Sequence, residues 1–176
     1  MDFRQVYDEH VAFVWRSLRR LGVRDAVVKD AVQDVFLVVH RRLPEYSPQA
    51  KVTTWLFRIC LNTARDQRRR AHVRREVLGD DGLEVATDPR EGADRVLERR
   101  EDLALFEAAV GRIDLDQRAV FILFELEDMT GEQIAESLEI PLGTVYSRLR
   151  LAREAFRKAV TLETARERSR RVESAR

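Results

Sequence analysis

The fold of this chain is decided by residues 130–158, TGEQIAESLEIPLGTVYSRLRLAREAFRK. Thr130 followed by Gln133, just ahead of Ile134, has the form of a capping box that opens a short helix. Pro141 suits the first position of a second helix, because its missing N–H would have no partner there. A short helix, a tight turn and a longer helix are the parts of a helix-turn-helix, whose second helix enters the major groove of DNA.

The second of these helices is expected to have one apolar and one basic face. At 100° per residue, four apolar side chains fall within about 60° of each other and should pack on the preceding helices. They are Val145, Leu149, Ala152 and Phe156. The outward face carries Ser147, Arg150, Leu151, Glu154 and Lys158, flanked by Tyr146, Arg153 and Arg157. A helical hairpin with a solvated basic face would give the same pattern, so this segment alone leaves both interpretations open.

The N-terminal part of the chain has the pattern of a helix bundle. Apolar residues in the first 21 positions recur at spacings of three and four, which predicts a helix that stops at Gly22. A second helix is expected from Asp25, as its N-cap, to Pro44. A third is expected from Thr53 or the next residue towards residue 77. Three helices with short connections predict a compact bundle over residues 1–77.

The rest of the chain completes an all-α architecture. Residues 78–96 contain Gly, Asp and Pro with few large apolar side chains, so we interpret them as a flexible acidic linker. Two further helices are expected in LERREDLALFEAAVGRI and DQRAVFILFEL, which makes residues 97–160 a four-helix domain that ends with the helix-turn-helix. The charged tail, residues 161–176, is expected to be disordered. The prediction is two small helical domains, an N-terminal bundle and a C-terminal helix-turn-helix domain, joined by the linker.

Several classes of protein are disfavoured by composition. The longest apolar runs, residues 35–39 and 119–124, are far shorter than the roughly 20 residues that span a bilayer, so we expect a cytoplasmic protein without membrane insertion of its own. The single cysteine, Cys60, lies in an apolar helical pattern and is expected to be an inert core thiol. Metal-binding spacings and glycine-rich phosphate loops do not occur in the sequence, so we expect no enzyme activity, metal or cofactor.

A net charge of +1 conceals a strong division of charge along the chain. Residues 1–75 carry +8 and residues 140–160 carry +4, whereas residues 76–102 and 103–139 carry −6 and −7. Two basic regions separated by an acidic one suit a polyanion that is held at two places. Chance clustering on solvated helix faces is the alternative.

Two faces of the N-terminal bundle are candidates for binding. On the third helix, four polar residues follow at i, i+4, i+7 and i+11 and form a cationic stripe, where arginines can pair with phosphates and stack on unpaired bases. They are Arg58, Asn62, Arg65 and Arg69. On the second helix, Asp30, Gln33, Asp34, Leu37 and Arg41 line an acidic face with an apolar centre. That face suits a basic protein partner, or it simply faces solvent.

Taken together, these segments resemble an extracytoplasmic-function (ECF) sigma factor, one of the two-domain specificity subunits of bacterial RNA polymerase. The resemblance covers residues 5–160. DAVQDVFLVVHRRLPEY resembles the family's polymerase-binding helix, and TWLFRICLNTARDQRRR resembles its promoter −10 helix. LEDMTGEQIAESLEIPLGTVYSRLRLARE resembles the domain that reads the −35 element.

The resemblance implies a function and three binding surfaces. The protein would direct core polymerase to promoters by recognising −10 and −35 elements and would promote DNA melting. The clamp helices of the polymerase's largest subunit are expected on Asp30, Gln33, Asp34, Phe36 and Leu37. The −10 element is expected on Lys51, Arg58, Asn62, Arg65, Arg69 and Arg70. The −35 element is expected on Thr144, Tyr146, Ser147, Arg148, Arg150, Leu151 and Arg153. An anti-sigma factor is a further implied partner.

Two details of the resemblance carry expectations of their own. The loop from Tyr46 to Thr53 would hold a base flipped out of the DNA, while Trp55 is assigned to core packing rather than to stacking. Tyr146 and Leu151 stand where family members often carry basic residues, so we expect altered or weaker −35 selectivity.

Two other functions stay open. A helix-turn-helix activator or repressor that does not replace a sigma subunit would explain PLGTVYSRLRLARE, residues 141–154, equally well, but it leaves the cationic stripe and the acidic face without a role. A sigma-like protein that binds partners without starting transcription is the other.

Overall fold

The computed structural model describes residues 2–47, 51–78 and 104–174. Most of the predicted linker and loop residues 48–50 lie outside the described residues. All regular structure within the described ranges is helical, which confirms the all-α class, and the helices fall into two units. None of the helices in these ranges has the length and apolar character needed to cross a bilayer.

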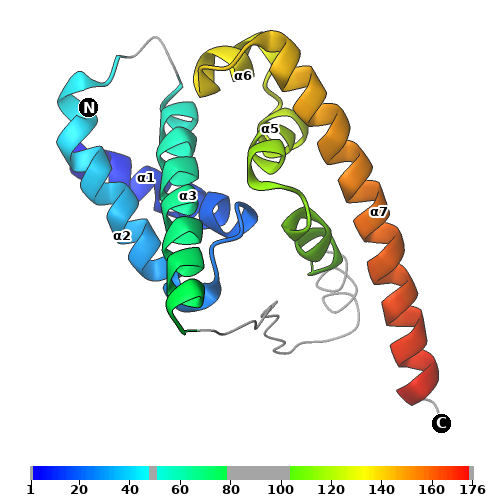
Figure 1. Ribbon diagram of the computed structural model, residues 1–176. Coiled ribbons are helices and arrows are strands. Elements are labelled where there is room, and N and C mark those ends of the chain that lie inside the picture. The colour runs from blue at the N-terminus through cyan, green and yellow to red at the C-terminus, as the bar shows by residue number, and fades with distance from the viewer. Residues whose placement is uncertain (1, 48–50, 79–103, 175–176) are drawn as a thin grey trace. The chain divides into compact units, whose positions relative to one another are not determined.

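The N-terminal unit is a bundle of three helices that pack on one another pairwise (Figure 1). They are α1 (Phe3–Arg20), α2 (Asp25–Arg42) and α3 (Val52–Leu78), with a short 3-10 helix, η1 (Leu43–Glu45), after α2. The core is formed by the apolar faces of all three, including Val14, Leu18, Val35, Val39, Phe57 and Leu61. Cys60 is fully buried among them, which confirms a core cysteine, and burial raises the pKa of its thiol.

The end of α1 is fixed by Gly22, as the sequence predicts. Its φ of 89° lies in the left-handed region that favours glycine. The Gly22 N–H donates to the Arg19 carbonyl at 2.9 Å, and the Val23 N–H donates to the Leu18 carbonyl at 3.0 Å. This is the Schellman pattern, and the burial of both Leu18 and Val23 completes it.

The predicted start of α2 is displaced by one residue. Arg24, not Asp25, occupies the N-cap position, and no side chain there caps the helix. Asp25 is the first helical residue and forms an ion pair with Arg19. An acid in the first turn interacts favourably with the helix dipole, which gives Asp25 a stabilising role without capping.

The C-terminal unit contains the helix-turn-helix. Residues 104–111 are helical, followed by α5 (Leu115–Glu125), α6 (Gly131–Leu138) and α7 (Leu142–Ser174). The longest helix, α7, packs along α5 (Figure 1). The core includes Val110, Ile113, Ala119, Ile122, Leu123, Ile134, Val145 and Leu149.

Both signals that predict the helix-turn-helix have structural counterparts. The capping box is confirmed, because the Gln133 N–H donates to Thr130 Oγ1 at 3.3 Å and the Thr130 N–H donates to Gln133 Oε1 at 2.9 Å. Pro141 lies one residue earlier than expected, since α7 begins at Leu142. The Pro141 carbonyl accepts the N–H groups of Thr144 and Val145 at 2.8 and 3.2 Å, as an N-cap carbonyl does.

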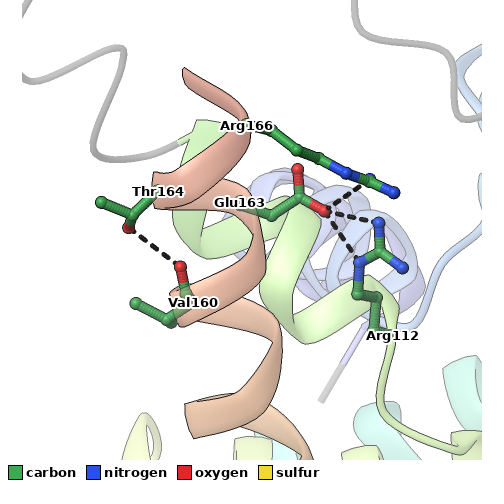
Figure 2. Close-up of polar contacts among 5 residues, drawn as sticks. All are labelled: Arg112, Val160, Glu163, Thr164 and Arg166. Carbon is green, nitrogen blue, oxygen red and sulfur yellow. Dashed lines mark hydrogen bonds and ion pairs between the residues drawn. The ribbon is translucent and has the colours of Figure 1, made fainter. Parts of the chain in front are cut away.

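The expectation of a disordered tail is wrong, because α7 continues to Ser174. Arg112, in the connection before α5, donates from Nε to Glu163 Oε1 at 2.8 Å, and Arg166 Nη1 lies 3.3 Å from the same oxygen (Figure 2). One turn away, Thr164 Oγ1 donates to the Val160 carbonyl at 2.9 Å. The contact with Arg112 spans 51 residues, so a local reading of the tail could not predict it.

A buried arginine holds the turn between residues 104–111 and α5. Arg118 is 5% exposed and donates from Nε and Nη2 to the Ile113 carbonyl at 3.2 and 2.7 Å, and from Nη2 to the Gly111 carbonyl. The guanidinium thus supplies donors to the Ile113 carbonyl where it is buried and to the Gly111 carbonyl, and an unpaired buried carbonyl would be costly. The turn therefore depends on Arg118.

Candidate nucleic-acid interface

The first half of α7 has the two faces predicted from the sequence. Val145, Leu149 and Ala152 are buried in the C-terminal unit. Phe156 is half-buried, with its ring centroid 5.2 Å from that of Phe121. The opposite face is exposed and carries Tyr146, Ser147, Arg150, Leu151 and Arg153. The face predicted to meet DNA is therefore accessible.

The three arginines predicted for the −35 element differ in how far they are already engaged. Arg148 lies 3.3 Å from Asp116 and its side chain is only 26% exposed. Arg153 donates from Nε to Glu125 at 2.7 Å and also lies over the ring of Phe124. Arg150 has a loose contact of 3.9 Å with Glu154 and keeps 71% of its side chain exposed. Arg150 is thus the most available of the three.

The remaining candidates on α7 are uncharged. The Ser147 hydroxyl donates to the Thr144 carbonyl at 3.0 Å, so it is satisfied within its own helix. Tyr146 and Leu151 are 51% and 39% exposed, so both are accessible to a partner. They form an apolar part of a surface that is otherwise polar.

The cationic stripe on α3 is exposed along most of its length. Asn62, Arg65 and Arg69 are exposed and Arg58 is half-exposed. Arg65 Nη1 donates to Asn62 Oδ1 at 3.2 Å, and Arg69 Nη2 lies 3.2 Å from Asp66. Exposed pairs of this kind contribute about 0–1 kcal/mol, so phosphates can replace them at little cost.

The other two candidates for the −10 element flank this stripe. Lys51 is exposed directly before α3, and its carbonyl accepts the N–H groups of Thr54 and Trp55 at 3.0 and 3.2 Å. Arg70 lines a groove of about 220 Å³ between α2 and α3. The structure therefore keeps all six candidates on α3 or at its start.

The assignment of Trp55 to the core is wrong. Its side chain is half-buried, and its ring centroid lies 5.1 Å from that of Tyr46, with the planes tilted by 46°. Trp55 therefore packs against the start of the loop that connects η1 to α3, rather than inside the bundle.

The predicted polymerase-binding face of α2 is mostly exposed. Asp30, Gln33 and Leu37 are exposed, with Leu37 at 60%, and Asp34 is half-buried at the edge of the groove beside α3. The groove is lined by Asp34, Leu37, Val38, Arg41, Thr63, Asp66, Gln67 and Arg70. The exposed Leu37, with Asp34 and Arg41 beside it, offers a protein partner both an apolar contact and charge pairing.

Phe36 does not belong to this face. It is 4% exposed, and its ring lies 4.6 Å from that of Tyr7 and 6.3 Å edge-on from that of Phe3. The prediction of a surface contact is wrong, because the residue next to the exposed Leu37 points into the contact between α1 and α2. Phe36 is part of the packing between α1 and α2 that lies beneath the exposed residues of this face.

Two helical units, one with a helix-turn-helix and each with a row of cations on an exposed helix face, define a modular DNA-binding protein. Residues 6–74 match the family Sigma-70 region 2, and residues 103–156 match Sigma-70, region 4. The chain is 32% identical over 153 residues to the RNA polymerase sigma factor NccH of Alcaligenes xylosoxydans xylosoxydans, covering 86% of this chain and 82% of the relative. It is 33% identical over 137 residues to the ECF RNA polymerase sigma-E factor of Escherichia coli K12, covering 73% and 71%.

The chain therefore belongs to the ECF sigma factors of the sigma-70 family, which are regulatory subunits that give RNA polymerase its promoter recognition. The same fold occurs in the sigma factor RpoE of Bartonella quintana, solved with the anti-sigma factor NepR, at a TM-score of 0.73 and 23% identity over 91% of this chain and 97% of that one. It also occurs in CnrH, solved with the cytosolic domain of CnrY, at a TM-score of 0.62 and 24% identity over 91% and 88% of the two chains.

Proposed function

We propose that this sigma factor holds a promoter at two places, with the first half of α7 on the −35 element and the stripe of α3 on the −10 element. The observation that carries the proposal is that each unit buries one face of a long helix and leaves a basic or mixed face exposed. Cations on both helices would neutralise phosphates and fix the register, while side chains that reach base edges select the sequence.

On α7, the proposal gives different tasks to different residues. Arg150 is exposed enough to reach a phosphate or a guanine edge. Leu151 offers apolar contact to a thymine methyl group, and Tyr146 presents half of its surface elsewhere on the exposed face of α7. Arg148 and Arg153 act mainly through their pairs with Asp116 and Glu125, which hold α7 on α5.

On α3, the proposed task is to favour strand opening. The arginines of the stripe pair with phosphates and stack on bases once these are exposed. Extruding a base costs a few kcal/mol, which such contacts must offset. The neighbouring pair of Tyr46 and Trp55 lies at the start of the loop that we propose holds the extruded base.

Protein partners are proposed for the acidic face of α2. Asp30 and Asp34 beside the exposed Leu37 suit a basic helix with an apolar ridge, and we propose that the clamp helices of the polymerase's largest subunit bind there. Because two sigma factors with this fold were solved with partner proteins, one of them named an anti-sigma factor, we also propose an anti-sigma factor for this chain, which would act in the cytoplasm.

The double substitution Arg65→Ala with Arg69→Ala tests the division of tasks. Open complexes on a promoter that the reconstituted holoenzyme recognises should become rarer, while binding to core polymerase is unchanged. The matched control is Arg4→Ala with Arg16→Ala, two exposed arginines on α1. If the double variant loses binding to core polymerase, rather than open-complex formation, the assignment of α3 is refuted. If the unmodified chain represses transcription instead of starting it, the protein is a repressor.

A further inference from the structure

Gly131, the first residue of α6, lies directly under the ring of Tyr146 on α7. It is buried, and a Cβ placed on it would lie 2.8 Å from the Tyr146 hydroxyl oxygen, 2.9 Å from Tyr146 Cζ and 3.2 Å from Leu142 Cδ1. At distances under 3.0 Å one partner must shift, and here the partner that can shift is the hydroxyl end of the Tyr146 side chain. The position therefore accepts a hydrogen atom and nothing larger while the ring stays where it is.

The backbone gives no other reason for glycine at this position. Gly22 is the one glycine with a positive φ in the described part of the chain, so Gly131 does not need the left-handed region. Glycine is also the poorest helix former after proline, and α6 has only eight residues. Two other helical glycines, Gly111 and Gly143, would have open space around an added Cβ. The constraint at Gly131 comes from Tyr146.

We infer that Gly131 is a positioning residue for Tyr146 and through it sets the base preference at the −35 element. This rests on the proposed function of α7. The hydroxyl end of the ring is seated on the first turn of α6, while half of the side chain remains exposed on the recognition helix. A tyrosine has only two side-chain torsions, so one contact of this kind fixes the ring before DNA arrives and reduces the entropy lost on binding.

The first experiment measures the position of the ring without DNA. The chain has three tyrosines, so fluorotyrosine incorporated into the full-length protein gives three fluorine resonances, of which Tyr146→Phe identifies the relevant one. Gly131→Ala should shift that resonance and leave the other two in place. Gly111→Ala, the same substitution in open space outside α7, should shift it far less. Equal shifts in both variants would overturn the inference.

The second experiment measures selection of promoters whose −35 bases are varied, with the reconstituted holoenzyme. Gly131→Ala should change the preference at one or two bases by about five-fold or more, the low end of what one base contact contributes. Gly111→Ala, which lies in open space outside α7, should not. In a Tyr146→Ala background, Gly131→Ala should have no further effect. A Gly131→Ala effect that persists there would mean that the glycine acts through the fold and would overturn the inference.

The same series separates the inference from the function on which it rests. If Tyr146→Ala alone leaves the −35 preference unchanged, the DNA-binding role of Tyr146 and the inference both fail. If Tyr146→Ala changes the preference and Gly131→Ala does not, only the inference fails. Should Gly131→Ala unfold the domain, Gly131→Ala with Tyr146→Ala removes both atoms that approach most closely. That pair should recover the fold and show the −35 preference of Tyr146→Ala alone, and no recovery would count against the inference.

Discussion

Replacing Arg150 should weaken the salt dependence of promoter binding, whereas replacing Arg148, two residues earlier, should not. Both are arginines on the first half of α7, and the sequence offers no reason to separate them. The structure does, because Arg148 is 26% exposed and paired with Asp116 at 3.3 Å, while Arg150 is 71% exposed and only 3.9 Å from Glu154. Arg150→Ala removes a cation that is available to a phosphate, whereas Arg148→Ala removes a cation that is already paired with Asp116.

The expected size follows from counterion release. Each phosphate contact contributes about 0.9 to the slope of log K against log salt, so Arg150→Ala should reduce the slope by about 0.9. Between 50 and 200 mM salt this slope corresponds to roughly a 3.5-fold change in affinity. The pair with Glu154 is long and exposed, so solvent and salt screen it, and breaking it changes the slope little. Arg148→Ala should reduce the slope by less than about a third of the reduction expected for Arg150→Ala.

The assay is fluorescence anisotropy of a labelled promoter duplex titrated with the holoenzyme over a salt series. Asp116→Asn provides a third arm, because it releases Arg148 and should steepen the slope. Thermal unfolding of each variant shows whether the domain is intact. Equal reductions in slope for Arg148→Ala and Arg150→Ala, with both variants folded, would refute the distinction that the structure makes between them.

Three further outcomes are expected. Thr130→Ala should destabilise the C-terminal domain by about 1 kcal/mol in urea unfolding, because it removes the acceptor for the Gln133 N–H; no loss would contradict a role for the capping box. Arg118→Met should cost about 3 kcal/mol or more in the same assay, since buried carbonyls lose their charged donor, and a cost below about 1 kcal/mol would contradict this. Cys60 should resist alkylation in the folded protein. Because burial raises the pKa of its thiol, the contribution of Cys60 to folding stability should be constant below pH about 9 and decline above it, so Cys60→Ala should make the loss of stability at alkaline pH smaller.

Much of the fold follows from local periodicity in the sequence. The apolar face of α7, the stop at Gly22 and the capping box at Thr130 depend on residues three to five apart, so their geometry is encoded within one or two helical turns. The all-α class was predictable for the same reason.

Features that depend on distant residues were not predictable. Asp116 and Glu125 lie 32 and 28 residues before the arginines with which they pair, and Glu163 lies 51 residues after Arg112. Periodicity places such side chains on a face but does not say what stands opposite. Periodicity therefore could not show that Arg148 and Arg153 pair with acids of α5, or that Arg112 contacts Glu163 of α7.

Phe36 and Gly131 illustrate two further limits. Phe36 adjoins the exposed Leu37, and a rotation of 100° per residue separates a surface residue from one packed against Tyr7. In the sequence, Gly131 is only a weak helix former at the start of a helix. The reason for glycine there is the nearby hydroxyl end of Tyr146, which only the structure shows. In both cases the missing information is the direction from which the neighbouring helix approaches.

Photocrosslinking tests the central claim, that the two helices hold two different promoter elements, most directly. A benzophenone amino acid would replace Tyr146 on α7 or Asn62 on α3, and the holoenzyme would be irradiated on a promoter that it selects from random DNA. We expect the crosslink from position 146 to map to the −35 element alone and the crosslink from position 62 to map to the −10 element alone. Crosslinks from both positions to one element, or to neither, would contradict the account.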